Sequence, residues 1–337
     1  MIRNRKAASG LLRSAVSSPQ AATVPATSQS NRIRTIFDLH SRASSSRPTV
    51  SVVICTRERP NDLRSCLESV ARLTPPPEEV IVVDNSTGDL ETEQLSKAFG
   101  VRCVVEESVG LSRARNRGIR ECRCEIVAYL DDDCLPDPEW LEYLLRPFSH
   151  SKVAAVAGEI IRFTDLKAEQ LHKPSTSQEM RYLSRETKRW FEMACFGGVG
   201  SGGNMAFRKA ACSEIVLFDE RLGRGAPFRI AEENCAFALL LAKGCSTVRV
   251  PTARVYHPIK QKDVGEEAKS SIAYWLLLFS KFPENRADLL HFLVRRILRR
   301  PVAWRFETEQ PGSIISSRLS VRFRALTGGI ALFLRAR

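Results

Sequence analysis

Between residues 50 and 130 the chain alternates short apolar, β-branched runs with stretches that have helical periodicity. The apolar runs lack an alternation of polar and apolar residues, which is typical of strands that are covered on both faces. They predict strands at 50–55, 80–84, 101–105 and 126–130. The stretches between them predict helices at 61–73, 91–99 and 112–121, the first ended by the prolines at 75–77. This order predicts an α/β domain with a mostly parallel sheet flanked by helices.

Polar residues stand where several of the predicted strands end. Thr56 and Asp84 follow the first two runs, and an acidic triplet at 131–133 follows the fourth. In open α/β sheets, ligands bind at the carboxyl ends of the strands. We therefore expect these residues to lie on one rim of the sheet.

A second part of the chain begins near residue 153. It holds a predicted strand to 161, a polar stretch, the glycine-dense segment 197–204, a helix at 232–243, and strands at 246–250 and 254–257. Beyond 260, three arginine-rich stretches mix aromatic and aliphatic residues as amphipathic interfacial helices do: 271–282, 291–306 and 313–337. We expect a tail over 1–46, a main domain over 47–260, and a basic amphipathic helical region over 261–337.

The charge of the chain favours anionic partners. Its 337 residues carry 51 Lys and Arg against 38 Asp and Glu, a formal net charge of +13. Nucleotides, anionic lipids and nucleic acids all suit such a field. No zinc-finger spacing, RNA-stacking signature or helix-turn-helix pattern is present, so we expect no nucleic-acid partner.

The ends and the cysteines indicate where the protein works. Residues 1–46 are rich in Ser, Ala and Arg with a single acid, which predicts a disordered basic tail, or alternatively a transit peptide. The ten cysteines lie mostly inside apolar runs and form no spaced framework, as reduced and packed thiols do. We expect a cytoplasmic protein, peripheral at the inner face of a membrane.

The acidic triplet is the sharpest chemical signal. Asp131, Asp132 and Asp133 end an apolar strand just before a predicted helix start. Three adjacent carboxylates repel one another unless solvent or a hard divalent cation neutralises them, which predicts a Mg²⁺ or Mn²⁺ site. A solvated turn in which Asp137 caps the next helix is the alternative.

The acidic triplet belongs to a series of motifs in which the chain resembles glycosyltransferase family 2. The resemblance rests on an ordered series that includes the strand 50–57, Ile81–Val82–Val83–Asp84, Leu130–Asp131–Asp132–Asp133, Gly110–Leu111–Ser112–Arg113–Ala114–Arg115–Asn116, the segment 202–208, and Glu232–Glu233. It covers roughly residues 49–257. It implies the GT-A fold of nucleotide-diphospho-sugar transferases and an inverting sugar transfer to an acceptor hydroxyl of a glycan, a polysaccharide or a lipid-linked compound.

The resemblance also implies roles for single residues. Thr56 and Asp84 would contact the base and ribose side of the nucleotide, Asp131 and Asp132 would hold ribose or sugar, and Asp133 would hold the metal. Structural alternatives stay open for the first two: a strand-end hydroxyl that ties down a turn, and an aspartate that starts the turn at 85–88.

Further candidates follow along the chain. Arg113, Arg115 and Asn116 would sit at a helix start that favours the diphosphate, or on a solvated basic helix face. Glu233 would be the general base, although the family usually has Glu-Asp where this chain has Glu-Glu; helix stabilisation by both acids is the alternative. His257 resembles a further metal ligand, or is a surface or core histidine.

Two rival functions remain. A sugar-nucleotide nucleotidyltransferase would need a glycine-rich phosphate loop after the first strand, where this chain has Cys-Thr-Arg-Glu-Arg-Pro. A non-catalytic basic protein that binds membranes or nucleic acids would explain the charge and leave the motif series unexplained.

Overall fold

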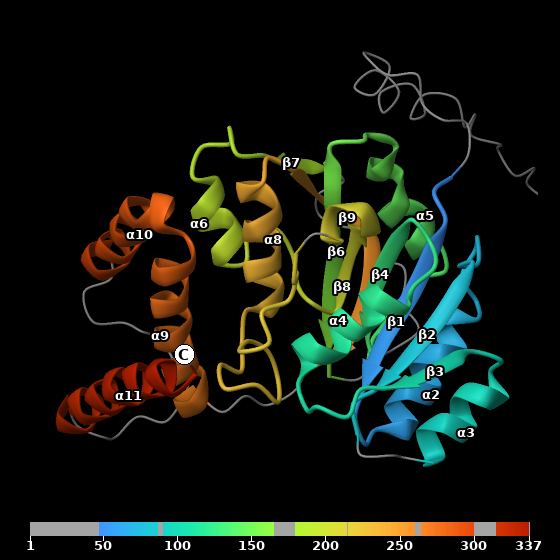
Figure 1. Cartoon of the computed structure of the whole chain (residues 1–337), viewed down its shortest axis with the longest axis horizontal. Coiled ribbons are helices and arrows are strands. Elements are labelled where there is room, and N and C mark those ends of the chain that lie inside the picture. Colours follow the sequence, from blue (N-terminus) through green and yellow to red (C-terminus); the bar gives the residue numbers. More distant parts are fainter. Residues whose placement is uncertain are drawn as a thin grey trace, which may run out of the picture. The chain divides into compact units, whose positions relative to one another are not determined.

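The computed structural model describes residues 47–86, 90–164, 179–213, 215–259, 264–299 and 315–336 (Figure 1). The tail expected over 1–46 lies outside these residues. Within them the sheet has nine strands in the order β3-β2-β1-β4-β8-β6-β9-β5, and β7 pairs with β9. The strands are β1 (Val50–Thr56), β2 (Glu79–Asp84), β3 (Arg102–Val105), β4 (Ile126–Asp131), β5 (Leu135–Pro136), β6 (Val153–Phe163), β7 (Arg181–Leu183), β8 (Asn204–Arg208) and β9 (Ser246–Pro258).

The sheet is mixed and mostly parallel, as the sequence predicts. β1 pairs in parallel with β2 and β4, and β2 pairs in parallel with β3. β8 runs antiparallel to both of its neighbours, β4 and β6, and was not predicted because its run of five residues follows a glycine-dense segment. The four predicted N-terminal strands are therefore confirmed, with bounds that shift by one residue at most.

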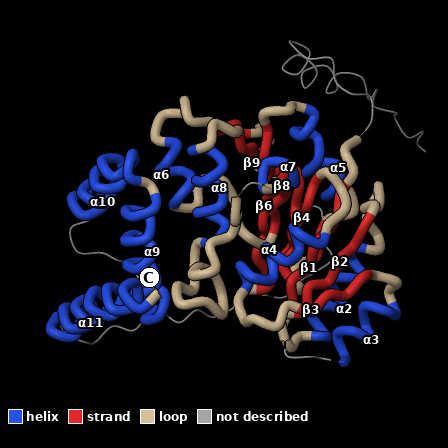
Figure 2. The backbone as a smooth tube through the Cα atoms, viewed as in Figure 1, coloured by secondary structure: helices blue, strands red, loops and turns tan. Residues whose placement is uncertain are grey.

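Helices cover both faces of the sheet (Figure 2). One face is covered by α2 (Pro60–Val70), α3 (Leu90–Ala98) and α5 (Trp140–Leu145). The other is covered by α4 (Leu111–Glu121) and α8 (Glu232–Ala242), with α6 (Trp190–Cys195) packed on α8. Helix α9 (Val264–Lys281) contributes to the same core cluster, and the short α7 (Lys209–Cys212) follows β8. The central strands are apolar on both sides because both faces are buried, so Val52 and Val53 are each 0% exposed although they point to opposite faces.

Helix α4 lies unusually close to β1. A Cβ atom on Gly118 would come within 2.6 Å of the Val53 side chain, so only glycine allows this approach. The contact fixes the height of α4 above the strand. Arg115, three positions before Gly118, lies near the carboxyl ends of the strands, where it pairs with Asp131.

The strands predicted at 246–250 and 254–257 form one strand, β9. The parallel register between β9 and β6 shifts between Gly158 and Glu159. Pro251 lies at this interruption of the hydrogen-bond ladder, where the missing amide hydrogen of proline costs no ladder hydrogen bond. Asn204 closes this irregularity: its Nδ2 donates to the carbonyls of Glu159 and Ala253, each at 2.8 Å. The side chain is 0% exposed and also accepts from the Trp140 indole.

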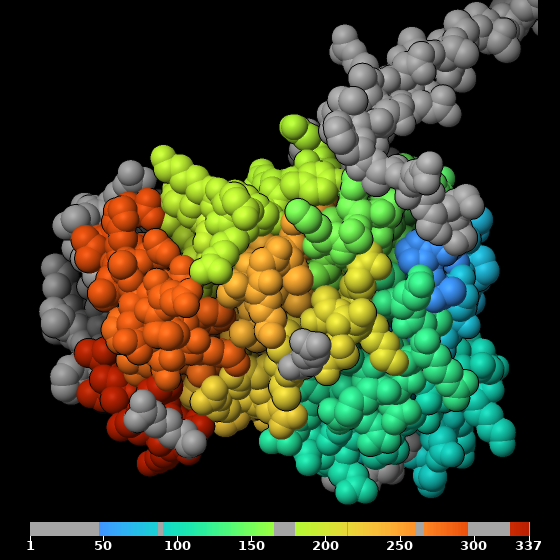
Figure 3. Space-filling model, turned by 45° about the horizontal axis from the view of Figure 1, so that its top comes forward, coloured from blue at the N-terminus to red at the C-terminus, as the bar shows by residue number. Residues whose placement is uncertain are grey.

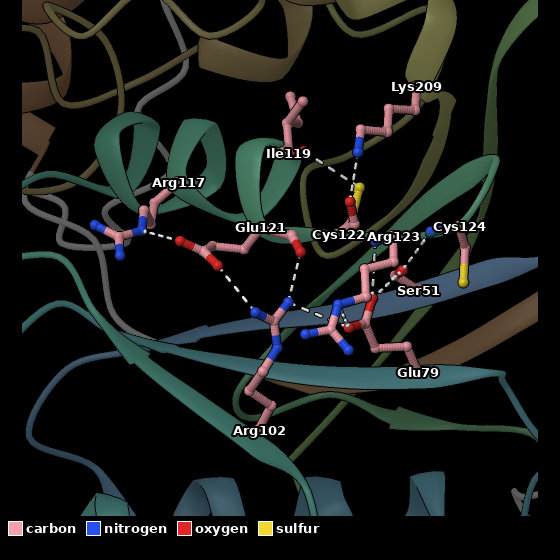
Figure 4. A network of polar contacts seen from close by, with 10 residues as sticks. All are labelled: Ser51, Glu79, Arg102, Arg117, Ile119, Glu121, Cys122, Arg123, Cys124 and Lys209. Atoms are coloured by element: carbon pink, nitrogen blue, oxygen red, sulfur yellow. Dashed lines mark hydrogen bonds and ion pairs between the residues drawn. The ribbon is translucent and has the colours of Figure 1, made fainter.

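A polar network joins the amino ends of the first three strands (Figure 4). Glu79, at the start of β2, accepts from the Ser51 hydroxyl at 2.6 Å and from the Arg102 guanidinium at 3.2 Å. Arg102 also pairs with Glu121, at the end of α4, at 2.9 Å. Although burial raises the pKa of Glu79, these hydrogen bonds and those from Arg123 outweigh it and lower the pKa below its ordinary value.

The three C-terminal helices make different contacts: the first contributes to the main core, the second packs on α6, and the third packs on the first. They are α9, α10 (Arg286–Arg299) and α11 (Ile315–Arg335). At Gly329 an added Cβ would lie 2.7 Å from Ile272 and 2.8 Å from the Lys269 carbonyl, so α11 approaches the backbone of α9 closely. The predicted helix over 291–306 is observed to Arg299, and its remainder lies outside the described residues. None of the described helices combines the length and the apolar character needed to cross a bilayer.

Candidate active site

The acidic triplet forms the floor of the site, at the carboxyl end of β4. Asp132 is 1% exposed, and its carboxylate accepts from the Thr56 hydroxyl at 2.8 Å. The Arg59 guanidinium lies 2.9 Å from Asp132 and 3.4 Å from Asp133. Thr56 ends β1 and Arg59 directly precedes α2, so two neighbouring strand ends supply the cluster, as expected for the rim of a parallel sheet.

Four potential metal-binding side chains converge here. The ligand atoms of Asp131, Asp133, Cys134 and His257 all lie within 4.8 Å of one another. His257 Nε2 is 3.4 Å from Asp133 and 4.0 Å from Asp131. The two carboxylates and the imidazole suit a hard cation such as Mn²⁺ or Mg²⁺, whereas the thiol of Cys134 is a soft ligand that such ions do not favour.

A hydrogen bond to the backbone fixes the orientation of the His257 ring. Its Nδ1 lies 2.6 Å from the Pro258 carbonyl oxygen. A carbonyl can only accept, so Nδ1 carries the proton of that hydrogen bond, and in the neutral ring Nε2 presents its lone pair to the carboxylates. This is the arrangement found behind many metal-binding histidines.

Burial and charge perturb the triplet. Desolvation raises the pKa of Asp132 to about 7, against the opposing effects of the Arg59 charge and the Thr56 hydrogen bond. The neighbouring charges of Asp133 and Asp131 raise it further. A carboxylate held in this way gains from any added cation, which is a common property of functional sites.

A cavity of about 230 Å³ opens over the triplet. Its wall contains the three aspartates together with three arginines, from the segment after β1 and from the loop before α8. It is lined by Cys55, Thr56, Arg57, Arg59, Asn85, Val109, Leu111, Ala114, Asp131, Asp132, Asp133, Arg224, Gly225 and His257. A lining that holds both carboxylates and guanidinium groups suits a ligand that carries both a diphosphate and a bound cation.

Arg115 is the buried link between the two groups of acids. It is 2% exposed, and its guanidinium lies 2.6 Å from Glu232 and 3.2 Å from Asp131. It also donates to the Gly202 carbonyl at 3.2 Å, in the glycine-dense segment. An added Cβ at Gly202 would lie 2.6 Å from the guanidinium, so glycine makes room for it.

Glu233 stands in the first turn of α8, next to Glu232. Desolvation raises its pKa to about 8, the Glu232 charge adds to this, and the Arg115 charge opposes it. A pKa in this range suits a group that takes up a proton near neutral pH. Glu233 does not line the 230 Å³ cavity described above.

The segment 217–230, which we call the cavity loop, runs along the start of α4. Leu111 donates its amide to the Arg224 carbonyl at 2.9 Å, and the Ser112 hydroxyl donates to the Leu222 carbonyl at 2.7 Å. Two predicted nucleotide-binding residues hold the same loop. Arg113 pairs with Glu220 at 2.8 Å, and Asn116 exchanges two hydrogen bonds with the Phe218 backbone, at 2.8 and 3.1 Å.

Asp84 is also engaged locally. Its Oδ1 accepts from the Ser86 amide at 2.9 Å and from the Ser86 hydroxyl at 2.6 Å, and the residue is 2% exposed. This is the turn that the sequence offered as the alternative to nucleotide contact. Arg113, Asn116 and Asp84 are thus anchors of loops, and none of them lines the cavity.

The structure therefore divides the predicted site residues. It brings together Thr56, the triplet and His257, and it places four others outside the lining: Asp84, Arg113, Asn116 and Glu233. Sequence reasoning missed Arg57, Arg59 and Arg224. The first two follow the end of β1 and could have been found from that position; Arg224 enters from the cavity loop, which has no motif of its own.

Known proteins resemble this chain in sequence and in fold. The model of the family "Glycosyl transferase family 2" matches residues 51–216. The glucosyl-dolichyl phosphate glucuronosyltransferase of Haloferax volcanii is 35% identical over 193 residues, which are 52% of this chain and 57% of the relative. The pre-mycofactocin glycosyltransferase of Mycobacterium tuberculosis is 33% identical over 189 residues, 52% of this chain and 37% of the relative. The glycosyltransferase AglE of H. volcanii is 33% identical over 125 residues, 35% of this chain and 41% of the relative, so the chain spans less than two thirds of these proteins.

Solved structures share the fold. S. aureus TarS 1-349 in complex with UDP-GlcNAc superposes with a TM-score of 0.57 at 15% identity, over 85% of this chain and 81% of that one. The mannosyltransferase PcManGT from Pyrobaculum calidifontis, solved with GDP-Man and Mn²⁺, superposes with a TM-score of 0.51 at 16% identity, over 90% of this chain and 80% of that one. The α/β architecture of the described residues is thus the GT-A fold predicted from the sequence.

Proposed function

Because the chain belongs to glycosyltransferase family 2, we propose that it transfers a sugar from a nucleoside-diphosphate sugar to an acceptor hydroxyl. The observation that carries the proposal is the cluster of Asp131, Asp133 and His257 in a cavity that arginines also line. A donor with a diphosphate needs both features. A nucleotidyltransferase would need backbone amides around a triphosphate, and the turn after β1 has no glycine to supply that approach.

In this proposal Thr56, Asp131 and Asp132 hold the nucleotide and sugar side of the donor. Arg59 and Arg224 line the cavity, where their planar guanidinium groups can each make two hydrogen bonds to phosphate oxygens of the diphosphate. Asp84, Arg113 and Asn116, for which the resemblance implies nucleotide contact, act here by holding the turn after β2 and the cavity loop.

Asp133 and His257 would hold the divalent cation, with Asp131 beside them. These residues suit a divalent cation because they offer carboxylate oxygens and an imidazole nitrogen. The hydrogen bond from Nδ1–H to the Pro258 carbonyl leaves Nε2 free to bind the cation. When bound, Mg²⁺ or Mn²⁺ supplies positive charge that stabilises the phosphate oxygens of the leaving nucleoside diphosphate.

Glu233 would act as the general base. The acceptor oxygen forms a bond to the anomeric carbon, the bond from that carbon to the phosphate oxygen breaks, and the hydroxyl proton passes to the Glu233 carboxylate. Attack opposite the leaving group inverts the anomeric centre. The raised pKa of Glu233 supports this role because a stronger base accepts the proton more readily.

The acceptor is proposed to be a glycan, a polysaccharide or a lipid-linked compound. The name of the H. volcanii glucosyl-dolichyl phosphate glucuronosyltransferase gives it a lipid-linked acceptor, which supports a lipid-linked acceptor here. Trp190 and Phe191, which could have lined an acceptor site, are packed in the core and are 8% and 2% exposed. The cytoplasmic location at the inner face of a membrane stays a prediction.

Calorimetric titration of a panel of nucleoside diphosphates, with and without Mn²⁺, tests the proposal. We expect one nucleotide to bind in the presence of Mn²⁺ and to lose this dependence in Asp133→Ala. Glu79→Ala is the matched control, because it removes a carboxylate at the amino ends of the strands and leaves the cavity intact. Absence of binding to every nucleotide in the panel would overturn the proposal.

A further inference from the structure

Helix α11 exposes a row of aliphatic side chains. Leu326, Ile330 and Leu334 are 47%, 40% and 60% exposed. They are spaced by four residues, so they lie above one another on one face of the helix. We call them the outer row of α11.

The outer row is not what attaches α11 to the protein. The attachment uses Phe333, which is 8% exposed, and Gly329, which lies against Ile272 and Lys269 of α9. Phe333 also stacks with Phe228, with ring centroids 6.5 Å apart. Exposed aliphatic groups in a row contribute nothing to this packing, and a contiguous apolar surface of this kind is typical of an interaction site.

The formal charge of the chain is concentrated at its two ends. From residue 286 to 337 there are eleven arginines, no lysine and three carboxylates, and from 1 to 46 there are seven basic residues and one acid. The 239 residues between them carry 33 basic and 34 acidic residues. The part that contains the candidate site is thus close to neutral, and the positive field arises from the ends.

In α11 all the charged residues are basic. The helix has four arginines and no acid, and Arg324 and Arg335, near the two ends of the outer row, are both exposed. Figure 3 shows α9, α10 and α11, in orange and red, grouped at one end of the described chain beside α6 and α8, with β1 to β3 at the other. On α10, Leu290 and Val294 are 52% and 50% exposed and again four residues apart.

We propose that the outer row of α11 docks the protein on an anionic lipid surface. Aliphatic side chains at this spacing can enter the headgroup region while the arginines bind lipid phosphates, and the helix then lies in the plane of the bilayer. A second copy of the chain is a poorer occupant, because two arginine-rich faces without acids would repel each other. The inference rests on the proposed function and deepens it, because docking would hold the transferase at a membrane that carries lipid-linked acceptors.

Flotation of the full chain with vesicles tests the docking directly. We expect the protein to float with phosphatidylcholine vesicles that contain phosphatidylglycerol, to float poorly with pure phosphatidylcholine, and to be released at high salt. Leu326→Ser, Ile330→Ser and Leu334→Ser combined should lower the partition coefficient by about 100-fold, because three partly buried aliphatic groups are lost. Arg324→Gln with Arg335→Gln should lower it by about 10-fold and weaken the salt dependence.

Matched controls separate docking from folding and from the proposed activity. Leu90, Val105 and Val216 are also exposed aliphatic residues, at 70%, 43% and 66%, and they lie outside the C-terminal helices. Their triple serine variant should float like the wild type. Nucleotide binding in Mn²⁺ should be the same in both triple variants, so that a failure of the transferase proposal is distinguishable from a failure of docking.

Three results would overturn the inference. The first is that the protein does not float with anionic vesicles at low salt. The second is that the outer-row variant floats as well as the wild type. The third is that the wild type binds no vesicles but forms a concentration-dependent dimer, which the outer-row variant does not form. The last result would assign the row to a second copy of the chain.

Discussion

The amino ends of β1, β2 and β3 and the carboxyl ends of β1 and β4 carry two polar clusters of opposite character. At the amino ends, Glu79 and Glu121 alternate with Arg102, and the pKa of Glu79 is lowered. At the carboxyl ends, three adjacent aspartates share few cations, and the pKa of Asp132 is raised to about 7. The first cluster is complete as it stands, whereas the second gains from additional positive charge.

This difference separates a structural network from a candidate site on the same sheet. A carboxylate whose neighbours lower its pKa stabilises the fold, and one whose surroundings raise it stores unfavourable free energy that a ligand can release. Both clusters contain arginines as well as acids. The sign of the pKa shift, and not the composition, distinguishes them.

The largest contrast is expected in turnover. Asp133→Asn should lower turnover by about 10³-fold, because the cation then loses a ligand at the leaving diphosphate. Glu79→Gln, at the other end of the strands, should change turnover by less than about twofold while it lowers the free energy of unfolding by about 1–2 kcal/mol. Steady-state kinetics and urea unfolding of both variants measure this, and equal losses of turnover would remove the distinction.

The next contrast concerns the arginines. Arg115→Met should lower the free energy of unfolding by about 3–5 kcal/mol, because Glu232 and Asp131 are left near a buried site without their partner. Arg102→Met should cost only about 1 kcal/mol, since its side chain is 30% exposed. Denaturant unfolding at one pH compares the two. A smaller loss for Arg115→Met would show that the link between the acids is not buried as described.

Glu233→Gln should lower kcat by about 10²-fold. In the wild type, kcat/KM should rise with pH as Glu233 loses its proton near its pKa of about 8. Because this pKa lies above the ordinary 4.5, the folded state binds the proton more tightly than the unfolded state, so the stability contribution is present below pH 4.5 and is lost as pH rises to about 8. Glu233→Gln should flatten both profiles; an unchanged pH dependence of kcat/KM would exclude Glu233 as the base.

The smallest contrast pairs two hydroxyls. Thr56→Val removes the hydrogen bond to Asp132, and Ser51→Ala removes the one to Glu79. Each should cost about 1 kcal/mol of stability. Only Thr56→Val should also weaken nucleotide binding, by about 10-fold, which calorimetry measures; equal nucleotide affinities in both variants would assign Thr56 a purely structural role.

The sequence predicted the parts that depend on local signals. β1 and β4 are continuous apolar runs, and the triplet follows the second of them directly, so both strand and site could be placed from a few adjacent residues. His257 was placed by its resemblance to a histidine that follows the acidic pair in related enzymes. These features need no knowledge of distant contacts.

The parts that were not predicted depend on residues far apart in the chain. Arg115 and Glu232 are 117 positions apart, and Asn116 and Phe218 are 102 apart. A motif places Asn116 near a helix start, where phosphate would be favourable, but it does not show that a distant loop covers that start. For the same reason Arg224 could not be assigned to the cavity.

The attachment of the cavity loop has a consequence for binding. Bonds to Leu111, Ser112, Arg113 and Asn116 hold it along α4, and Asp219 is further paired with Lys281 of α9 at 2.8 Å. The conformational entropy of this segment is therefore lost when the chain folds, not when a donor arrives. A preorganised wall of this kind favours tight nucleotide binding without a large ordering cost, and it makes the affinity sensitive to residues that never touch the ligand.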